Sequence, residues 1–258
     1  MKRAIIMGAS SGIGQEVARL LFFDGWTIGV AARREEALIE WKQKQLSFLT
    51  KAENQQATSF AEKIFTMSID VCEPDAPQKL ILLIERLGGI DLYIHASGIG
   101  KQNPYLETDI ELNTVRTNGL GFTQMMDTVF RYMAENDGGH IVAISSIAGT
   151  KGLALAPSYS ATKAFQNTYI EALEQLADNR HLKICFTDIR PGFVDTPLLA
   201  GGKYPMLLDK RMVAKKIMRA IEKKKHVYII DWRWRIMTFL WGLIPRFIWR
   251  RWKLFKKR

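Results

Sequence analysis

Cysteine and histidine are scarce in this sequence. The chain has two cysteines and four histidines among its 258 residues. Cys72 and Cys185 lie far apart, and Cys185 stands in a short apolar run, so we expect a buried thiol there rather than half of a disulfide. His140, His181 and His226 lie at the approaches to expected strands without the spacing of metal ligands. We therefore expect structural histidines and no metal site.

Long apolar runs and targeting segments are missing as well. The uncharged run 236–245 has ten residues, whereas a membrane-spanning helix needs about 20. The first apolar run, 4–7, leads straight into a glycine-rich turn and leaves no room for a signal peptide. We therefore expect a protein of the reducing cytosol, with residues 1–231 as one domain and residues 232–258 as a tail of different composition.

Short apolar runs alternate with longer segments of helical periodicity along the chain. Strand, helix and strand in regular order predict a parallel sheet with helices on both faces, which is a doubly wound α/β fold. The segment 35–63 is long for one crossover, so we expect an extended helix there. The expected strands are 4–7, 27–31, 64–69, 92–95, 141–145, 184–189 and 227–230, and the other expected helices are 14–23, 76–87, 118–134 and 159–177.

A glycine-rich turn follows the first expected strand and opens a helix. Glycines let the backbone approach a pyrophosphate closely, and the amide groups at the start of a helix stabilise its charge. The spacing Gly-x3-Gly-x-Gly in this context predicts a dinucleotide site, with a merely tight turn as the alternative. The expected cofactor contacts are Gly8, Ser10, Ser11, Gly12, Ile13 and Gly14.

The second expected strand ends without an acidic residue. A cofactor that lacks a 2′-phosphate needs a carboxylate here to accept from its ribose hydroxyls, but this chain has Arg33 and Arg34. Guanidinium groups bind a phosphate dianion through paired hydrogen bonds. These residues favour NADP(H) over NAD(H), with Ser10 as a further contact. The alternative is that both arginines are solvated charges at the start of a helix.

Asp70 and Val71 follow the third expected strand. The Asp70 carboxylate is placed to accept a hydrogen bond from the amino group of an adenine. An aspartate at this point can equally cap the turn that follows. Both interpretations stay open in the sequence.

Tyr159 and Lys163 are four residues apart in an expected helix, so both side chains lie on one face. The Lys163 charge favours the phenolate form of Tyr159, and so brings a phenol with a free pKa of about 10 into use nearer neutral pH. Ser146, thirteen residues before Tyr159, adds a hydroxyl. Together the three groups predict a site that reduces a carbonyl or oxidises an alcohol.

With these motifs in order, the sequence resembles the short-chain dehydrogenase/reductase family over residues 2–230. Tyr159, Lys163 and Ser146 match the family's catalytic residues, and Asn118 matches its catalytic asparagine. The segment 190–196 resembles the Pro-Gly segment that lies beside the nicotinamide. The resemblance implies a Rossmann fold and further cofactor contacts from Tyr159, Lys163, Pro191, Gly192, Val194 and Thr196.

The resemblance also implies a role for each catalytic residue. Tyr159 gives its proton to the developing alkoxide, while Lys163 lowers the phenol pKa and binds the nicotinamide ribose. Ser146 donates a hydrogen bond to the substrate oxygen. Asn118 shapes its helix so that its backbone carbonyl holds a water that relays protons to Lys163.

One loop departs from the family pattern. Where the family has Asn-Asn-Ala-Gly after the fourth strand, this chain has His95, Ala96, Ser97 and Gly98. The small residues and Gly98 keep the close backbone approach to the cofactor. We expect His95 to be a buried or cofactor-adjacent hydrogen-bonding residue, and the alternative is a second acid–base group.

The segment 210–258 carries all of the basic excess. It has 17 Lys and Arg against two acids, a net charge of +15, so the preceding residues sum to −4 in a chain of +11. Five of the seven tryptophans lie there too. Basic and aromatic residues together are typical of a helix on an anionic bilayer surface. A helix through this segment would carry one apolar stripe opposite its basic residues: Met237, Trp241, Ile244, Ile248, Trp252 and Phe255.

Other interpretations of this segment stay open. The stripe can pack on the protein's own body or on a sister subunit, the charge can bind nucleic acid, or the end can be disordered. Pro245 can start a second helix or kink a single one. Membrane association is preferred, and no nucleic-acid partner is expected because no nucleic-acid-binding fold accompanies the charge.

The helices expected from Asn118 and Tyr159 carry the family's usual dimer surface. They hold more apolar residues than one buried face requires, so we expect a homodimer or a homotetramer. The residues concerned are Phe122, Met125, Met126, Phe165, Tyr169 and Leu173.

The sequence thus predicts an NADP(H)-dependent oxidoreductase that interconverts a carbonyl and an alcohol on a lipophilic substrate. It is expected in the cytoplasm, peripheral on the inner face of the membrane. One alternative is a soluble small-carbonyl reductase whose tail serves oligomerisation. Another is a non-enzymatic nucleotide-sensing or scaffold protein. We expect substrate choice to depend on residues 101–109 and 197–208.

Overall fold

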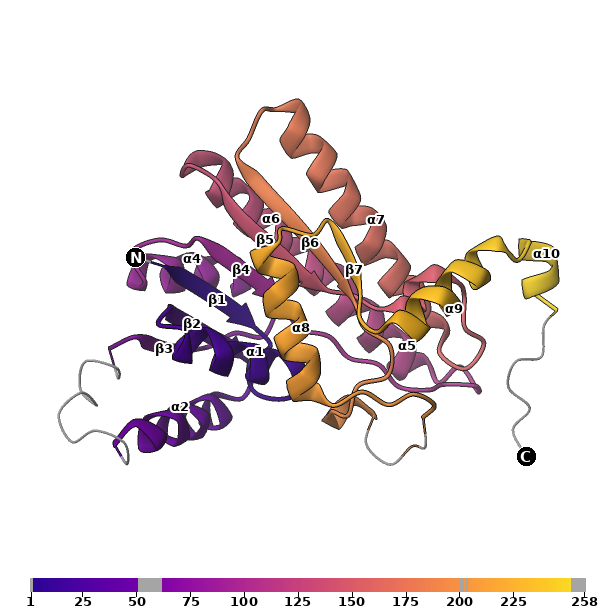
Figure 1. The fold of residues 1–258 in the computed structure, drawn as a ribbon, viewed down its shortest axis with the longest axis horizontal. Coiled ribbons are helices and arrows are strands. Elements are labelled where there is room, and N and C mark those ends of the chain that lie inside the picture. Colours follow the sequence, from indigo (N-terminus) through magenta and orange to yellow (C-terminus); the bar gives the residue numbers. More distant parts are fainter. Residues whose placement is uncertain (1, 51–61, 200–201, 203, 252–258) are drawn as a thin grey trace.

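A seven-stranded parallel sheet forms the centre of the protein (Figure 1). The structure is a computed structural model that describes residues 2–50, 62–199, 202 and 204–251. The strands lie in the order β3-β2-β1-β4-β5-β6-β7. Each agrees with an expected strand to within two residues, which confirms the doubly wound α/β fold. Their bounds are β1 Arg3–Met7, β2 Thr27–Ala32, β3 Ile64–Ser68, β4 Leu92–His95, β5 Gly139–Ile144, β6 Ile184–Arg190 and β7 Val227–Ile229.

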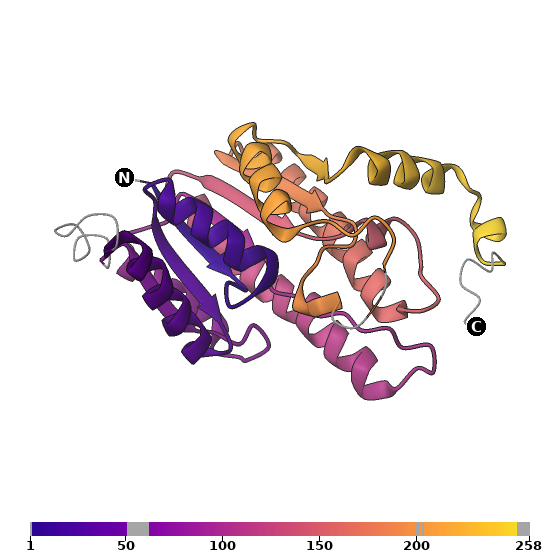
Figure 2. The ribbon, with the colours of Figure 1, turned by 60° about the horizontal axis from the view of Figure 1, so that its bottom comes forward.

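Alternate strand residues contribute to two hydrophobic cores, one on each face of the sheet. In β1, Ala4 and Ile6 belong to one core, and Ile5 and Met7 belong to the other. Both faces are therefore buried, as a parallel sheet requires (Figure 2). Residues of α1 (Gly12–Phe23), α2 (Glu35–Thr50) and α8 (Lys210–Glu222) line the first core, and those of α4 (Ala76–Arg86), α6 (Phe122–Glu135) and α7 (Pro157–Asn179) line the second.

The strand order reverses between β1 and β4. β2 and β3 lie on one side of β1, and β4 to β7 lie on the other. Ligands of open α/β sheets bind at such a point, beyond the carboxyl ends of the strands. The loops after the two strands are tied together there, because the Ala96 amide donates to the Met7 carbonyl at 2.8 Å.

The helix expected at 118–134 is longer and irregular. Three elements follow one another without a break: α5 (Thr108–Val115), a π-helical segment η1 (Arg116–Gly121) and α6. The π-helical turn packs closely on the end of the third strand, since a Cβ atom at Gly121 would lie 2.8 Å from the Val71 carbonyl oxygen. Single π-helical turns are frequent at functional sites, and this one contains Asn118.

The C-terminal segment forms two helices. α9 (Trp232–Leu243) ends before Pro245, and α10 (Arg246–Trp249) begins after it. Proline fixes φ in the range of a first helical turn and has no amide proton to donate, so it starts the second helix here.

Within the described residues, the apolar stripe expected between Met237 and Phe255 does not all face outward. Met237 and Trp241 pack against the core of the body instead, next to Trp234. Trp241 also lies against Trp249 of α10, with ring centres 5.7 Å apart, while Trp252 and Phe255 lie outside the described residues. The sequence left open whether Pro245 starts a second helix or kinks a single one, and the structure has the second helix, so the residues on either side of the proline share no single helical face.

Four of the six residues expected at a subunit contact are buried inside the chain itself. They lie in the core between the sheet and helices α6 and α7, whereas Phe165 is exposed and Tyr169 only partly buried. The apolar excess of these helices is thus largely used within one chain. The four residues are Phe122, Met125, Met126 and Leu173.

None of the helices within the described part of the chain combines the length and the apolar character needed to cross a bilayer.

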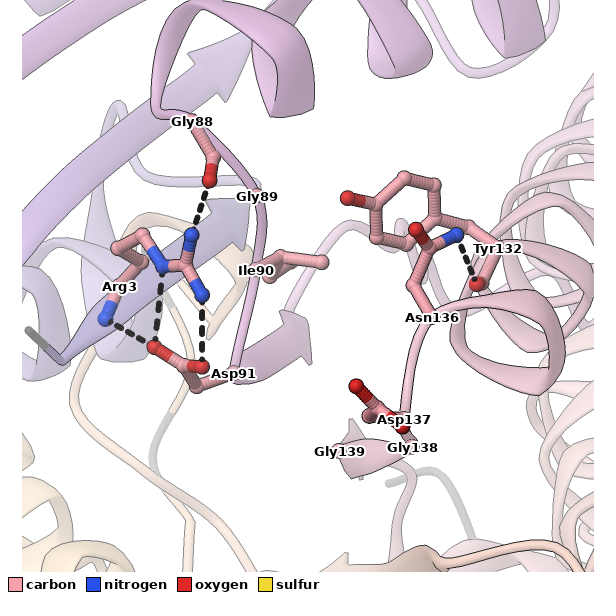
Figure 3. A pocket seen from close by; sticks show the side chains of 10 residues that line it. All are labelled: Arg3, Gly88, Gly89, Ile90, Asp91, Tyr132, Asn136, Asp137, Gly138 and Gly139. Atoms are coloured by element: carbon pink, nitrogen blue, oxygen red, sulfur yellow. Dashed lines mark hydrogen bonds and ion pairs between the residues drawn. The ribbon is translucent and has the colours of Figure 1, made fainter.

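A hollow lies at the amino ends of β1, β4 and β5 (Figure 3). It is at the opposite end of these strands from their carboxyl ends, where ligands of open α/β sheets bind. Arg3 donates there to both carboxylate oxygens of Asp91, at 3.2 and 3.1 Å, and to the Gly88 carbonyl. These groups connect the start of β1 to the approach of β4. The hollow contains none of the residues expected to bind cofactor or substrate.

Candidate active site

The glycine-rich turn between β1 and α1 leaves space beside the backbone. Gly8 has a φ of +92°, and a Cβ atom there would lie 2.5 Å from the Ser97 amide nitrogen. A Cβ atom at Gly14 would lie 2.4 Å from the Gly8 carbonyl oxygen. Only glycine fits at both positions. Since α1 begins at Gly12, its first backbone amides are available to an anion at this turn.

The other residues expected to contact the cofactor at this turn differ in their structural surroundings. Ser11 is the N-cap residue of α1 in an extended conformation, without a side-chain capping bond. Ile13 packs against the hydrophobic core. A Cβ atom at Gly12 would lie 3.3 Å from the methyl group of Thr196. The turn therefore meets the 190–196 segment, which the sequence separates from it by more than half of the chain.

Arg33 and Arg34 follow β2 beside the glycine-rich turn. The Nη2 atom of Arg34 lies 3.4 Å from the Ser10 hydroxyl oxygen. Both arginine side chains are exposed. The glycine cradle and the two cations lie side by side at the point where the sequence predicts the ribose of a dinucleotide.

Asp70 caps the turn that follows β3. Its Oδ1 atom accepts a hydrogen bond from the Cys72 amide at 3.0 Å. This is the second of the two interpretations that the sequence left open. Val71 beside it is buried against η1. A contact of Asp70 with adenine stays a prediction.

Tyr159 is partly buried at the start of α7. Burial raises the pKa of its phenol, and a hydrogen bond with Ser146 opposes this change. Ser146 follows β5 and accepts a bond from the Ala148 amide at 3.0 Å. The Tyr159 ring packs against Gly100, where a Cβ atom would lie 2.6 Å from the ring. The structure thus brings together the hydroxyl groups that the sequence paired.

Lys163 lies one helical turn further along α7. Burial lowers the pKa of its ammonium group to about 8, while the charge of Asp188 acts in the opposite direction. The ammonium nitrogen lies 5.8 Å from the centre of the Tyr159 ring and donates to the Ile144 carbonyl at 3.1 Å. A buried cation next to a phenol favours loss of the phenolic proton.

Asn118 closes the loop after β4. Its side-chain oxygen accepts from the Ile99 amide at 2.9 Å, and its side-chain nitrogen donates to the Ile99 carbonyl at 2.7 Å. At Gly98 a Cβ atom would lie 3.3 Å from the Asn118 side-chain oxygen and 3.6 Å from the Lys163 nitrogen. The loop therefore reaches the residues expected to be catalytic, and the contact of Gly98 with a cofactor stays a prediction.

Gln166 is a residue of the site that the sequence analysis missed. Its side-chain nitrogen donates to the backbone carbonyl of Asn118 at 2.9 Å, and its side-chain oxygen accepts from Lys163 at 2.9 Å. The resemblance assigned this carbonyl to a water molecule. The available signal was its position three residues after Lys163, which puts both side chains on one face of α7.

His95 is buried and neutral. Its Nδ1 atom lies 3.0 Å from the Tyr93 hydroxyl, and its ring packs edge-on against Phe122. Burial lowers the pKa of its imidazole to about 3, helped by the nearby charge of Lys163. This confirms the expected buried hydrogen-bonding residue, because a group that stays neutral near pH 7 is a poor acid–base catalyst.

A charged pair behind the catalytic residues was also missed. Asp188 in β6 pairs with Arg190 through an Nε to Oδ2 contact of 2.6 Å, and accepts a hydrogen bond from Ser145. Asp188 is buried. Spacing alone could have suggested the pair, since residues two apart in a strand share a face.

The segment after β6 joins the site to the C-terminal helix. The Ile147 amide donates to the Pro191 carbonyl at 3.1 Å. A Cβ atom at Gly192 would lie 2.2 Å from the indole nitrogen of Trp234. Val194 is buried, and its carbonyl accepts from the Thr196 hydroxyl at 3.3 Å. The described residues contain no cluster of side chains that could hold a metal ion.

Comparisons with known proteins agree with this arrangement. The family described as "short chain dehydrogenase" matches residues 2–203, and the chain therefore belongs to the short-chain dehydrogenase/reductase family. An uncharacterized oxidoreductase of Myxococcus xanthus is 28% identical over 252 residues, which cover 95% of this chain and 93% of the relative. Dehydrogenase/reductase SDR family member 7B of Bos taurus is 27% identical over 263 residues, covering 95% and 78%.

Solved structures show the same fold. A short-chain dehydrogenase/reductase from Mycobacterium ulcerans has a TM-score of 0.77 at 19% identity, covering 97% of this chain and 98% of that one. ElxO with NADP bound has a TM-score of 0.74 at 23% identity, covering 91% and 99%. An actinorhodin polyketide ketoreductase with NADPH has a TM-score of 0.71 at 24% identity, covering 89% and 95%. The protein is an NAD(P)-dependent oxidoreductase of this family.

Proposed function

We propose that the protein uses NADP(H) to interconvert a carbonyl compound and an alcohol, with Tyr159 as general acid and base. The observation that carries the proposal is the hydrogen bond of the partly buried Tyr159 with Ser146, beside the buried Lys163 ammonium group. When bound, the nicotinamide supplies or accepts the hydride. The chain itself supplies the proton and orients the substrate oxygen.

Burial keeps the Tyr159 phenol protonated until a substrate oxygen gains negative charge. The phenol then donates its proton to that oxygen, and Lys163 stabilises the phenolate that remains. Ser146 donates a hydrogen bond to the same oxygen, which stabilises the charge that develops on it. Oxidation of the alcohol runs through the same contacts in the reverse direction.

The preference for NADP(H) rests on Arg33 and Arg34. They follow β2, where no carboxylate is present to accept from the ribose hydroxyls, and Arg34 contacts Ser10 of the glycine-rich turn. Two of the solved structures with this fold are described with NADP or NADPH, which supports the same choice. Asp70 and Val71 are proposed to lie beside the adenine.

A lipophilic substrate is favoured by the two segments expected to select it. Tyr105 is 80% exposed, and Leu106 in the same segment is exposed as well. Leu198 and Leu207 are exposed in the segment after Thr196. Apolar side chains at the surface of both segments suit an apolar substrate better than a charged one.

Oxidation of NADPH in the presence of a series of aldehydes and ketones of increasing chain length tests this function. We expect kcat/KM to rise with chain length and to fall at least 100-fold in Tyr159→Phe. A maximum at the shortest carbonyls would favour the small-carbonyl reductase instead. No oxidation with any carbonyl, together with intact NADPH binding, would favour the nucleotide-sensing or scaffold alternative.

A homodimer or homotetramer is proposed through α5, η1 and α7. The residues first expected there are largely buried, but other apolar side chains of these helices are exposed. Light scattering that gives about 29.5 kDa at micromolar concentration would contradict this assembly. The exposed residues are Leu112, Val115, Leu120, Phe165 and Leu176.

We also propose a cytoplasmic protein that lies peripherally on the inner face of the membrane. The support is the net charge of +15 in residues 210–258, of the sign that an anionic leaflet attracts. The segment 232–258 is the part of the chain proposed to make this contact.

A further inference from the structure

Helix α9 is apolar on both of its sides. Its inner side packs on the body through Trp234, which is 2% exposed and lies edge-on to Phe193 with ring centres 5.5 Å apart. Met237 and Trp241 extend the same contact. A surface helix in a globular protein normally has one apolar stripe and a polar opposite side. The inner side already accounts for that stripe.

The opposite side of α9 is apolar as well, and it is exposed. Phe239 is 66% exposed and Leu243 is 65% exposed. At 100° per residue this side spans a sector of about 100°, with Arg233 and Arg235 at its two edges. We call this sector, together with Phe247 and Ile248 of α10, the outer face. Its members in α9 are Trp232, Ile236, Phe239, Leu240 and Leu243.

The outer face has no cover from the described part of the chain. In Figures 1 and 2, α9 and α10 extend from the body beyond β7, and no other drawn helix or strand lies on their outer side. A contiguous group of large exposed apolar side chains is rare on a monomer and is usually an interaction site.

The charge around the outer face identifies its partner. Arg235, Arg246, Arg250 and Arg251 are exposed along the two helices. The one acidic residue of the segment 231–258, Asp231, is already paired with Arg233 through contacts of 2.9 and 3.0 Å. A second copy of this face would bring like charges together, which opposes a symmetric contact. An anionic bilayer offers negative headgroups at the edges and an apolar region beneath them.

We propose that the outer face of α9 and α10 docks the protein on an anionic membrane surface. The docking helices are fixed to the catalytic end of the sheet. Lys151 donates to the Ile244 carbonyl at 2.9 Å, and the Trp249 indole donates to the Gly152 carbonyl at 2.8 Å. Both contacts lie a few residues after Ser146. Docking therefore brings the catalytic residues next to the bilayer, and this consequence for substrate delivery rests on the proposed function.

Flotation tests the docking without cofactor or substrate. The vesicles are phosphatidylcholine alone, or phosphatidylcholine with 30% phosphatidylglycerol. We expect the wild type to float with the anionic vesicles only and to be released at high salt, because salt screens the charges. Phe239→Glu with Leu243→Glu should reduce the bound fraction at least tenfold. The matched control, Phe48→Glu with Leu82→Glu, makes the same charge change at exposed positions in α2 and α4 and should bind as the wild type does.

Trp232→Phe provides a second measurement in a conservative variant. The wild type should show a blue shift of tryptophan emission with anionic vesicles, and this variant should show a smaller one. Equal binding by both double variants, or no flotation of the wild type, would overturn the proposal. A change of molecular mass in the outer-face variant without vesicles would identify the face as a subunit contact instead. Oxidation of NADPH with a small soluble carbonyl is measured separately, so failure of docking and failure of the proposed function are distinguishable.

A different observation carries a second inference, which rests on the proposed function. The buried Gln166 side chain connects the Asn118 carbonyl to the Lys163 ammonium group through two hydrogen bonds of 2.9 Å. It occupies the place between these groups that the family resemblance gives to a water. We infer that Gln166 is a positioning residue that fixes Lys163 beside Tyr159 and excludes the relay water from the Asn118 carbonyl.

The pH dependence of kcat/KM and of NADPH binding tests this role. Gln166→Glu puts a carboxylate beside Lys163, so the basic limb of both profiles should move up by at least one pH unit. Gln166→Leu removes one partner of the ammonium group and should move the limb down. Gln175→Leu, an exposed glutamine on the same helix, is the matched control. Unchanged profiles in both Gln166 variants would overturn the inference, and the binding profile gives the answer even if turnover is absent.

Discussion

The part of α7 that carries Tyr159 and Lys163 and the C-terminal helix α9 differ in where their side chains find partners. Lys163 and Gln166 are buried polar residues, Tyr159 beside them is partly buried, and each has a partner inside the chain. The outer face of α9 consists of exposed apolar residues that no described element covers. The polar groups of α7 therefore find their hydrogen-bond partners within the chain, whereas the apolar outer face of α9 is left for an outside partner. The comparison thus distinguishes residues whose contacts are complete within the fold from residues that are available for an interaction with another molecule.

The largest expected effect lies on the catalytic side of this comparison. Tyr159→Phe keeps the ring against Gly100 but removes the proton, so turnover should fall by about 10²–10⁴-fold while NADPH affinity changes little. Separate measurements of turnover and of cofactor binding check this. A variant that keeps more than about a tenth of the wild-type rate would owe less than about 1.4 kcal/mol of its barrier to the hydroxyl, and the assignment would be wrong.

The two sides of α9 should differ almost as strongly in their effect on stability. Trp234→Ala leaves a cavity in the core and should lower the free energy of unfolding by about 3–5 kcal/mol. Trp232→Ala, at an exposed position of the same helix, should change it by about 0.5 kcal/mol or less. Urea unfolding of both variants makes the comparison. Equal losses would show that the helix has no inner and outer side.

Replacement of Arg33 should have a smaller effect, which we expect on the affinity for NADPH and much less on the affinity for NADH. Arg33→Asp should weaken NADPH binding by about 1.5–3 kcal/mol, the contribution of a charged hydrogen bond, and affect NADH much less. Fluorescence titration with both cofactors measures the two losses. An equal loss for both would mean that Arg33 supports the fold rather than the phosphate.

The smallest effect near neutral pH is the pH dependence of stability that His95 contributes. Its pKa is about 3 in the folded chain and about 6.5 when unfolded. Between these values the unfolded chain binds the proton and the folded chain does not, so stability is lost as the pH falls through this window, by up to about 1.4 kcal/mol per pH unit.

His95→Asn removes this titration and keeps a polar side chain at the position. Its stability should therefore decrease less steeply than that of the wild type below pH 6.5, as measured by urea unfolding at several pH values. Parallel pH dependences in the two proteins would show that His95 is accessible to protons in the folded state.

Most of the body follows from the sequence because local signals and tertiary structure agree there. Short apolar runs placed the strands and period-3.6 patterns placed the helices, and Gly8 and Gly14 marked positions where a Cβ atom has no room. The spacing of Tyr159 and Lys163 on one helix face was enough to predict their proximity. The order of the strands in the sheet then places Ser146, which follows β5, beside Tyr159.

Features that depend on contacts between distant segments were beyond the sequence. The π-helical turn around Asn118 has no pattern of its own, and the partner of its carbonyl, Gln166, lies on another helix. The apolar residues of α9 are compatible with either side of the helix facing inward. Only the packing of Trp234 on Gly192 decides which side does so. The sequence of a helix with two apolar sides does not indicate which side packs on the body.

That contact makes positions 192 and 234 a coupled pair for evolution and for engineering. The indole occupies the space that any side chain at Gly192 would need, so an enlargement at one position selects for a reduction at the other. A selection that starts from Gly192→Ala should recover suppressors in which Trp234 is replaced by a smaller residue. The loop that the family resemblance places beside the nicotinamide and the helix that we propose to dock on a membrane can therefore change only together.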